Sequence, residues 1–254
     1  MFIALLLACT GNLVQLHASG IQVTLGDLQT VVPASNLPQG VVAQTSNNNL
    51  DVIEHTDGRL YFAFRTAPSH FASDEVQMHV LSSADDGLTW DLELTLDMDT
   101  DLREPRFLSH NGRLIFHYAV LGTNPLDFEP QGTMRRVKDE SGWSEAEWIF
   151  DDGFIPWRTR IIDGTPTMIG YTGGADIYDQ DEDVLPQLEV RWLQSSDGLN
   201  WTGQTVWTGG GSEADFTFTD NAIIAVIRNE AGDEDGFGSK VCRAGRDSPT
   251  DWAC

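Results

Sequence analysis

Several arginines in the sequence stand among apolar and aromatic neighbours, as in the segments FAFR, PWR and VIR that end at Arg65, Arg158 and Arg228. Such an arginine is seldom a solvated surface charge, because a guanidinium group is costly to bury without partners. Its planar fork of donors matches carboxylates and also binds hydroxyl groups. The side chains expected to face a common centre are Asp51, Arg65, His70, Arg103, Glu104, Arg158, Glu213 and Arg228. This set predicts a pocket for a carboxylate-bearing or polyhydroxyl ligand, with acids placed for proton transfer.

A second interpretation of the same residues stays open. A buried arginine needs an acid as a partner, and the available acids are Asp51, Asp74, Glu104 and Glu213. These groups could form structural ion pairs that fill the centre of the fold and leave no room for a ligand. The sequence has no Cys/His cluster, phosphate-binding loop or dinucleotide fingerprint, so we expect no metal or cofactor in either interpretation.

A repeat of about fifty residues must position these side chains. Tryptophans recur at spacings of 53, 58 and 51 residues, at Trp90, Trp143, Trp201 and Trp252. Strand starts recur at spacings of 54, 53 and 56 residues, at Leu60, Leu114, Thr167 and Ile223. In the first unit the pattern predicts strands at about 50–55, 59–65, 75–82 and 90–96. Four short strands per repeat predict an all-β propeller with about four visible blades.

The register of the repeat adds further polar and aromatic residues to the expected centre. The inner strands and the ends of the second strands contribute Asn49, Tyr118, Trp157, Tyr171, Asp215 and Glu230. Inner strands of a propeller point toward its axis, so we expect these side chains to lie near the arginines and acids.

Two short motifs mark turns between strands of the repeat. Residues 83–90 match the pattern S-x-D-x-G-x-T-W, and residues 195–201 form a shorter variant, S-x-D-G-x-x-W. The aspartate can accept bonds from turn N–H groups, the glycine supplies a positive φ, and the tryptophan packs between strands. We therefore expect a structural role, joining the third and fourth strands of a blade, for Ser83, Asp85, Gly87, Trp90, Ser195, Asp197, Gly198 and Trp201.

The two motifs resemble the Asp-boxes, or BNR repeats, of the sialidase-like (neuraminidase superfamily) β-propellers, and the resemblance covers about residues 47–252. Residues 60–74 are similar to a family segment with a strand, an arginine and an acid. Residues 211–230 are similar to a segment with a glutamate and a carboxylate-binding arginine. The resemblance implies that Asp74 is the acid/base and that Glu213 partners a nucleophilic tyrosine. It also implies that Arg228 belongs to an arginine triad and that Arg65 lines the same pocket.

The sequence also departs from the family pattern. No Phe/Tyr-Arg-Ile-Pro segment precedes Leu60, and none of the four tyrosines stands at the family's nucleophile position. The sequence stops at the tryptophan of the fourth repeat, so we expect a truncated propeller. The alternative is a shorter ring closed by an N-terminal strand at residues 21–25.

Three functions remain open for such a propeller. The first is a sialidase-like glycoside hydrolase that acts on an extracellular glycan. The second is a non-catalytic surface propeller that binds glycan or protein. The third is a different, five-bladed, carbohydrate-active propeller, because paired acids on inner strands occur there too.

Charge and the N-terminal segment limit the partners and the location. With 39 Asp and Glu against 15 Lys and Arg, the net charge of −24 disfavours nucleic acid and anionic membrane surfaces as partners. Residues 1–9 are predicted to be a signal peptide ending in a lipobox whose Cys9 carries lipid; a signal with a misplaced start, or a buried strand, is the alternative. We expect a monomeric bacterial cell-envelope lipoprotein or secreted protein that contacts a membrane only through that lipid.

The domain boundaries and the remaining cysteines follow from this location. We expect the signal at 1–9, an N-terminal segment with the candidate closing strand at 10–40, and the propeller at 41–254. In an oxidising compartment Cys242 and Cys254 are free to form a disulfide.

Overall fold

Antiparallel strands make up nearly all of the regular structure in the computed structural model. The structure describes residues 15–18, 21–24, 26, 28–177, 187–233 and 236–254, and these contain no α-helix. The chain divides into two compact units, residues 1–37 and 38–254. The predicted lipobox and Cys9 lie outside the described residues.

The first unit contains one hairpin. β1 (Gln15–Ala18) pairs with β2 (Ile21–Thr24) in a two-stranded antiparallel sheet. β2 covers most of the segment suggested to close a ring. Its partner in the described residues is β1, so these two strands form a sheet of their own.

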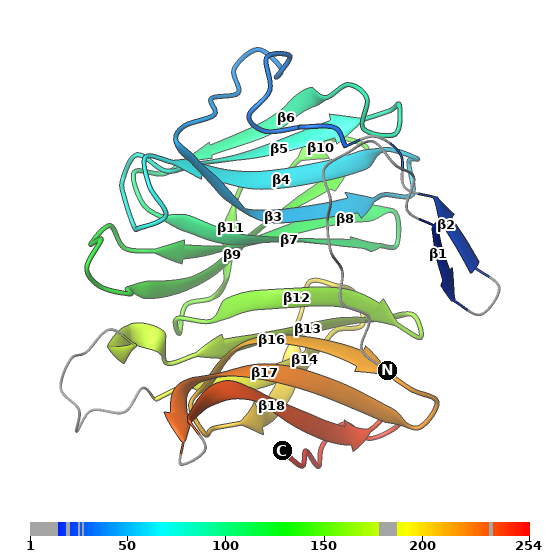
Figure 1. Cartoon of the computed structure of the whole chain (residues 1–254), viewed down its shortest axis with the longest axis vertical. Coiled ribbons are helices and arrows are strands. Elements are labelled where there is room, and N and C mark those ends of the chain that lie inside the picture. The colour runs from blue at the N-terminus through cyan, green and yellow to red at the C-terminus, as the bar shows by residue number, and fades with distance from the viewer. Residues whose placement is uncertain (1–14, 19–20, 25, 27, 178–186, 234–235) are drawn as a thin grey trace. The chain divides into compact units, whose positions relative to one another are not determined.

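The second unit contains four antiparallel sheets that follow one another as blades (Figure 1). The first blade has the order β3 (Ser46–Glu54), β4 (Leu60–Ala67), β5 (Gln77–Ser83) and β6 (Asp91–Asp97). The second has β7 (Leu102–His110), β8 (Arg113–Leu121) and β9 (Pro130–Asp139), whose edge pairs with β10 (Gly142–Trp143) and β11 (Glu147–Phe150). The third has β12 (Ile155–Ile162), β13 (Thr165–Thr172), β14 (Glu189–Gln194) and β15 (Thr202–Trp207), with a 3-10 turn η1 (Gly174–Asp176).

The fourth blade has three full strands, β16 (Gly211–Phe218), β17 (Ala222–Asp233) and β18 (Gly236–Gly245). The place of a fourth strand is taken by a single bridge between Arg243 and Ala253. Next to this bridge a disulfide joins Cys242 to Cys254. The predicted all-β propeller with four blades is confirmed, and the strands of the first blade begin and end within a few residues of the predicted limits.

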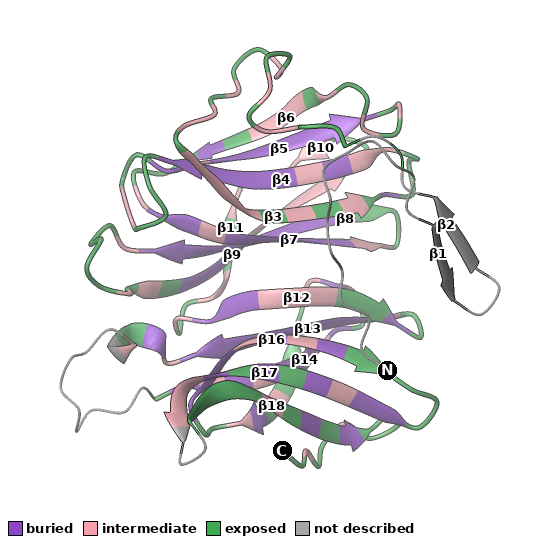
Figure 2. Cartoon of the chain, viewed as in Figure 1, coloured by how far each residue is buried: buried purple, intermediate pink, exposed green. Residues whose placement is uncertain are grey.

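The apolar core lies between successive blades. One cluster joins the first and second blades and includes Tyr61, Met78 and Phe116. Another joins the third and fourth blades and includes Trp192 and Phe216. The second strands β4, β8 and β13 are almost wholly buried, because neighbouring strands and blades cover both of their faces (Figure 2). β4 and β8 therefore read as nearly continuous apolar runs, whereas β13 also carries three threonines.

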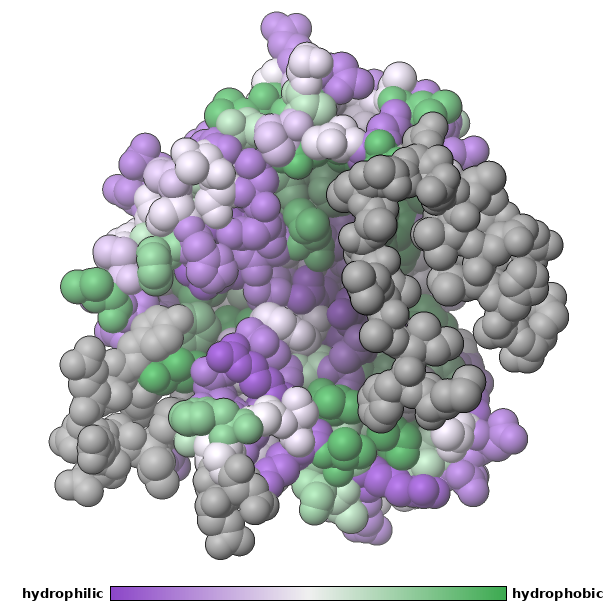
Figure 3. Space-filling view, viewed as in Figure 1, coloured by the Kyte–Doolittle hydropathy of each residue, from purple (hydrophilic) through white to green (hydrophobic). Residues whose placement is uncertain are grey.

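The described surface is mostly polar on the face shown in Figure 3, with apolar side chains scattered between hydrophilic ones. This agrees with the strongly negative net charge. No helix among the described residues has the length and apolar character needed to cross a membrane.

Candidate functional site

The innermost strands of the four blades each carry a β-bulge at an equivalent position. The strands neighbour one another in the order β3, β7, β12 and β16. Their pairing register shifts between residues 48 and 50, 103 and 106, 156 and 158, and 211 and 214. The residues at these shifts that line one common pocket are Asn49, Glu104, Trp157 and Glu213. A bulge redirects the side chain at the irregularity, so the repeated bulge brings four strands to one pocket.

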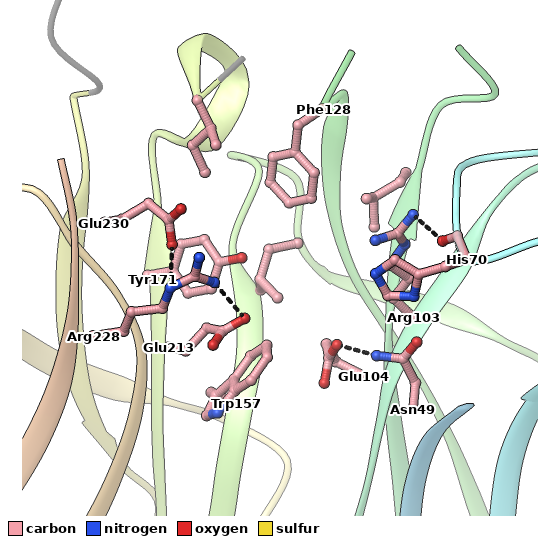
Figure 4. A pocket seen from close by; sticks show the side chains of 13 residues that line it. Asn49, His70, Arg103, Glu104, Phe128, Trp157, Tyr171, Glu213, Arg228 and Glu230 are labelled. Atoms are coloured by element: carbon pink, nitrogen blue, oxygen red, sulfur yellow. Dashed lines mark hydrogen bonds and ion pairs between the residues drawn. The ribbon is translucent and has the colours of Figure 1, made fainter. Parts of the chain in front are cut away.

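The pocket encloses about 230 Å³, which is small for a ligand site. Its polar lining forms two groups (Figure 4). On one side lie Tyr171, Glu213, Arg228 and Glu230, and on the other lie Asn49, His70, Arg103 and Glu104, with Trp157 between them. The apolar lining comes from Leu121, Phe128, Ile155 and Ile177. Such a mixture of aromatic and planar polar groups is typical of a site for a small polar ligand.

In the first group, Arg228 holds two carboxylates. Its Nη1 lies 3.2 Å from Glu213 Oε1, and its Nε lies 3.0 Å from Glu230 Oε2. The buried Ser212 hydroxyl also donates to Glu230 Oε2, at 2.9 Å. The Arg228 side chain is 54% exposed, so this clamp faces the open side of the pocket.

Tyr171 stands behind this clamp on β13. Its side chain is buried, and burial raises the pKa of its hydroxyl well above 10, with the negative charges of Glu104, Glu213 and Glu230 acting in the same direction. The phenol therefore stays protonated, so it is suited to donate a hydrogen bond and unsuited to act as a phenolate nucleophile.

Next to the second group, outside the pocket lining, the fully buried carboxylate of Asp101 joins two arginines. It accepts from Arg65 Nε at 2.8 Å and from Arg103 Nε at 2.7 Å. Arg103 Nη2 also donates to the carbonyl of His70 at 3.1 Å. Burial lowers the pKa of the His70 imidazole, and Arg103 and Arg65 act in the same direction, so His70 is neutral near pH 7.

Glu104 is the most enclosed carboxyl group in the lining, with 6% of the residue exposed. Its Oε2 lies 2.6 Å from Arg106 Nη2, and its Oε1 accepts from the amide of Asn49. Burial raises its pKa; Arg106 and Arg103 oppose this effect, and Glu213 reinforces it. The pocket therefore holds a buried carboxyl group near a more exposed one, Glu213.

Arg65 does not reach the pocket, contrary to the prediction from the sequence. It is fully buried, and besides Asp101 it donates to the carbonyls of Ser69 and Phe71, at 3.2 and 3.0 Å. Arg65 therefore fixes the loop between β4 and β5 and so places His70 at the pocket.

Asp74 also lies outside the lining of the pocket. It is exposed in the turn before β5. Arg65 holds the loop at residues 69–71 through hydrogen bonds to two of its carbonyls. His70 in this loop therefore lines the pocket, whereas Asp74, four residues later, does not. The implied acid/base role would require Asp74 to line the same pocket as Glu213. The structure does not place Asp74 there.

Asp51 and Arg158 line a second cavity, further along the inner strands. Asp51 accepts a bond from the N–H of Phe107 at 2.7 Å. Burial raises its pKa against the effect of this bond and of two nearby arginines. Arg158 Nε lies 3.4 Å from Asp215 Oδ1, which Arg160 also contacts, at 2.9 Å. These residues lie beyond the bulges and therefore face a different space from Glu104 and Glu213.

Of the predicted site residues, the structure brings five to the pocket: His70, Arg103, Glu104, Glu213 and Arg228. Two residues outside the predicted set, Asp101 and Arg106, hold Arg103 and Glu104 of the second group in place. Both lie in the segment DLREPR beside Arg103 and Glu104, and this alternation of acids and arginines was the available signal. Phe128, which comes from the loop between β8 and β9, is a further residue outside the predicted set.

The two turn motifs that resemble Asp-boxes do not line this pocket and lie in turns between third and fourth strands. Residues 83–90 connect β5 to β6, and residues 195–201 connect β14 to β15. Gly87 and Gly198 have φ of 84° and 74°, which favour glycine. Trp90 packs against Phe62, with ring centroids 5.7 Å apart. These contacts are those of turn formation.

Comparison with solved structures gives the same fold. A Trypanosoma rangeli sialidase in complex with the inhibitor DANA superposes with a TM-score of 0.58 and 13% identity, over 82% of this chain and 37% of the sialidase. A second structure of the T. rangeli sialidase gives a TM-score of 0.54 and 14% identity, over 91% of this chain and 37% of the sialidase. A family 117 glycoside hydrolase of the marine bacterium Zobellia galactanivorans gives 0.50 and 13%, over 82% and 68%.

These likenesses show that the fold is a sialidase-like β-propeller. The chain spans little more than a third of the length of the sialidase that it matches. Neither a protein-family model nor a curated protein sequence matches this chain.

Proposed function

We propose that this propeller binds carbohydrate in the pocket between its inner strands. The observation that carries the proposal is the composition of that pocket. Carboxylates and arginines line two opposite sides, and the half-buried ring of Trp157 lies between them (Figure 4). The sialidase-like fold supports the proposal, because the solved structures that share it include a sialidase and a glycoside hydrolase.

The chemistry of a sugar suits this lining. Each hydroxyl group both donates and accepts a hydrogen bond, so it can bridge a carboxylate such as Glu213 and a donor such as Asn49 or Arg103. The C–H faces of a sugar ring are apolar and pack against aromatic side chains, for which Trp157 is placed. The small volume favours one or two sugar units over a long chain within the pocket.

Binding is tested by titrating the protein with a panel of oligosaccharides in calorimetry, after a glycan array has identified the ligands. We expect Trp157→Ala to weaken binding at least about tenfold, because it removes the aromatic surface of the pocket. The matched control is Trp148→Ala, since Trp148 is 47% exposed on β11 and does not line the pocket. Equal effects of the two substitutions, or no glycan bound by the unaltered protein, would refute the proposal.

Hydrolysis is a second candidate function, favoured by the unequal surroundings of two carboxyl groups. Burial raises the pKa of Glu104, which suits a proton donor, whereas Glu213 is ion-paired with Arg228 and more exposed. Glycoside hydrolysis uses two such carboxyl groups in different protonation states. We expect Glu213→Gln to abolish release of reducing sugar while glycan binding persists. Binding without hydrolysis by the unaltered protein would assign the non-catalytic function instead.

The proposed location is extracytoplasmic, with an anchor at Cys9. This part of the proposal rests on the N-terminal sequence alone. It agrees with an extracellular glycan as the ligand, and labelling of cells with a radioactive fatty acid, with and without Cys9→Ser, tests it. Label on the unaltered chain that the substitution removes would support lipidation at this residue, and label that persists would exclude it.

A further inference from the structure

Both arginines that line the pocket are already engaged by acceptors of the protein. Arg228 uses Nη1 for Glu213 and Nε for Glu230. Arg103 uses Nε for Asp101 and Nη2 for the carbonyl of His70. A bidentate bond to a ligand carboxylate needs two neighbouring N–H groups of one guanidinium, both free to face the ligand. In each of these arginines two of the three nitrogens already have a protein partner, so a bidentate ligand would have to share at least one nitrogen with an acceptor of the protein.

With all four acids in their ionised forms, the charges around the pocket also balance before any ligand enters. The charged groups counted are those that line the pocket, their direct ion-pair partners, and the arginine that shares Asp101. They comprise four arginines and four acids: Arg65, Arg103, Arg106 and Arg228, with Asp101, Glu104, Glu213 and Glu230. His70 adds no positive charge near pH 7, since burial lowers its pKa. A ligand carboxylate would therefore enter a balanced site and meet three glutamates of the same sign.

From these two observations we infer that the ligand of this pocket is a neutral sugar without a carboxylate group. The inference rests on the proposed carbohydrate binding and specifies its substrate class. A neutral sugar uses the remaining N–H groups and the carboxylate oxygens through its hydroxyls, and it leaves the five ion pairs intact. An acidic sugar must displace Glu213 or Glu230 from Arg228, or bind the remaining N–H groups beside these two glutamates, and like charges side by side weaken binding.

The inference departs from what the sequence resemblance implies for Arg65 and Arg228. A carboxylate-binding role requires these guanidinium groups to be free in the pocket. Arg65 is fully buried beneath the β4–β5 loop, and Arg228 is held between two glutamates. Arg65 and Arg228 are the residue types that the resemblance implies. Their partners in this structure show that each of them holds acids of the protein in place.

Matched pairs of sugars that differ in one carboxylate test the inference directly. The probes are the methyl glycosides of galactose and galacturonic acid, the methyl glycosides of glucose and glucuronic acid, and an oligosaccharide with and without its terminal sialic acid. At pH 7 we expect the neutral member of a bound pair to bind at least about tenfold tighter in calorimetry. An acidic member that binds as tightly or more tightly overturns the inference and leaves the proposed carbohydrate binding intact. If no member binds and a broad glycan array is also blank, the proposed function itself fails and the inference falls with it.

A substitution in the clamp provides a second test that does not depend on which sugar binds best. Glu230→Gln frees Arg228 Nε from a carboxylate while the new side-chain carbonyl can still accept from Ser212. We expect the ratio of acidic to neutral affinity to rise several-fold. The control is Glu145→Gln, which makes the same change of charge at an exposed position outside the pocket. Equal shifts in the two variants, or no shift in either, would show that the clamp does not set the preference.

Discussion

The carboxylates of the Asp-box turns and those of the pocket are held in opposite ways. Asp85 accepts from the backbone and side chain of Thr89 at 2.8 and 2.7 Å, and from Ser83 at 2.8 Å, so its partners lie within four residues. Asp101 is held by Arg103 and by Arg65, which lies 36 residues earlier in the chain. The turn acids close local loops, whereas Asp101, which supports the pocket from outside its lining, joins β4 to the segment at the start of β7.

The two groups of acids also differ in how their surroundings affect ionisation. Hydrogen bonds from Thr89 and Ser83 lower the pKa of Asp85 to about 2. Bonds from Asn200 and Leu199 likewise lower the pKa of Asp197. Burial instead raises the pKa of Glu104. A carboxylate in an exposed turn is thus stabilised as an anion by its neighbours in sequence. A carboxyl group in the pocket is stabilised as an anion by arginines that the fold places beside it.

Removing Asp101 should produce the largest effect, because two arginines lose their buried partner. We expect Asp101→Ala to lower the free energy of unfolding by about 3–5 kcal/mol, the typical cost of breaking a buried ion pair. Urea denaturation followed by tryptophan fluorescence measures this change. Ligand binding should fall too, because Arg103 loses the bond that positions it beside the pocket.

The control for this prediction is Asp91→Ala, which removes the partner of Arg59. Asp91 is 79% exposed, so we expect its loss to change the free energy of unfolding by at most about 1 kcal/mol. Similar losses in the two variants would contradict the distinction between acids that hold strands together and acids at the surface.

The same difference explains what the sequence could and could not predict. The fold and the two turn motifs depend on a regular period and on contacts within a few residues, and both are visible in the sequence. The direction of Asp51 and Arg158 depends on where each inner strand bulges. A bulge shifts the alternation of side chains by one residue and sends them to another face. Short-range patterns do not show where that shift falls, and Asp101 was missed because its partner Arg65 comes from another blade.

Asp85→Ala should have a smaller effect, and one that depends on pH. The pKa of Asp85 is lower in the folded protein than the ordinary value of about 3.9, so its ionised form stabilises the fold above that value. This contribution disappears as the pH falls from about 4 to about 2, because the carboxylate then binds a proton. We therefore expect a lower Tm for Asp85→Ala at pH 6, and a difference from the unaltered protein that narrows toward pH 2. Thermal unfolding followed by circular dichroism at several pH values measures it.

Asp220→Ala serves as the control for the turn. Asp220 is exposed in the turn between β16 and β17, and no side-chain hydrogen bond to it is found among the described residues. Its substitution should leave Tm nearly unchanged from pH 6 to pH 2. A Tm difference for Asp85→Ala that stays constant down to pH 2 would show that the ionised side chain is not what stabilises the Asp-box.

Asp74→Ala should have the smallest effect on binding and hydrolysis. This substitution decides whether Asp74 is a pocket acid or an acid of an exposed turn. The sequence resemblance implies a pocket acid, and the structure places Asp74 in an exposed turn outside the pocket lining. We expect its glycan affinity, and any hydrolytic rate, to match those of the unaltered protein within about twofold, because surface substitutions away from a site have small effects. Glu213→Gln, measured in parallel, should lose hydrolysis.

If Asp74→Ala instead abolished hydrolysis and left the fold intact, the β4–β5 loop would have to bring Asp74 to the ligand when the ligand binds. The separation between turn acids and pocket acids would then fail at this residue.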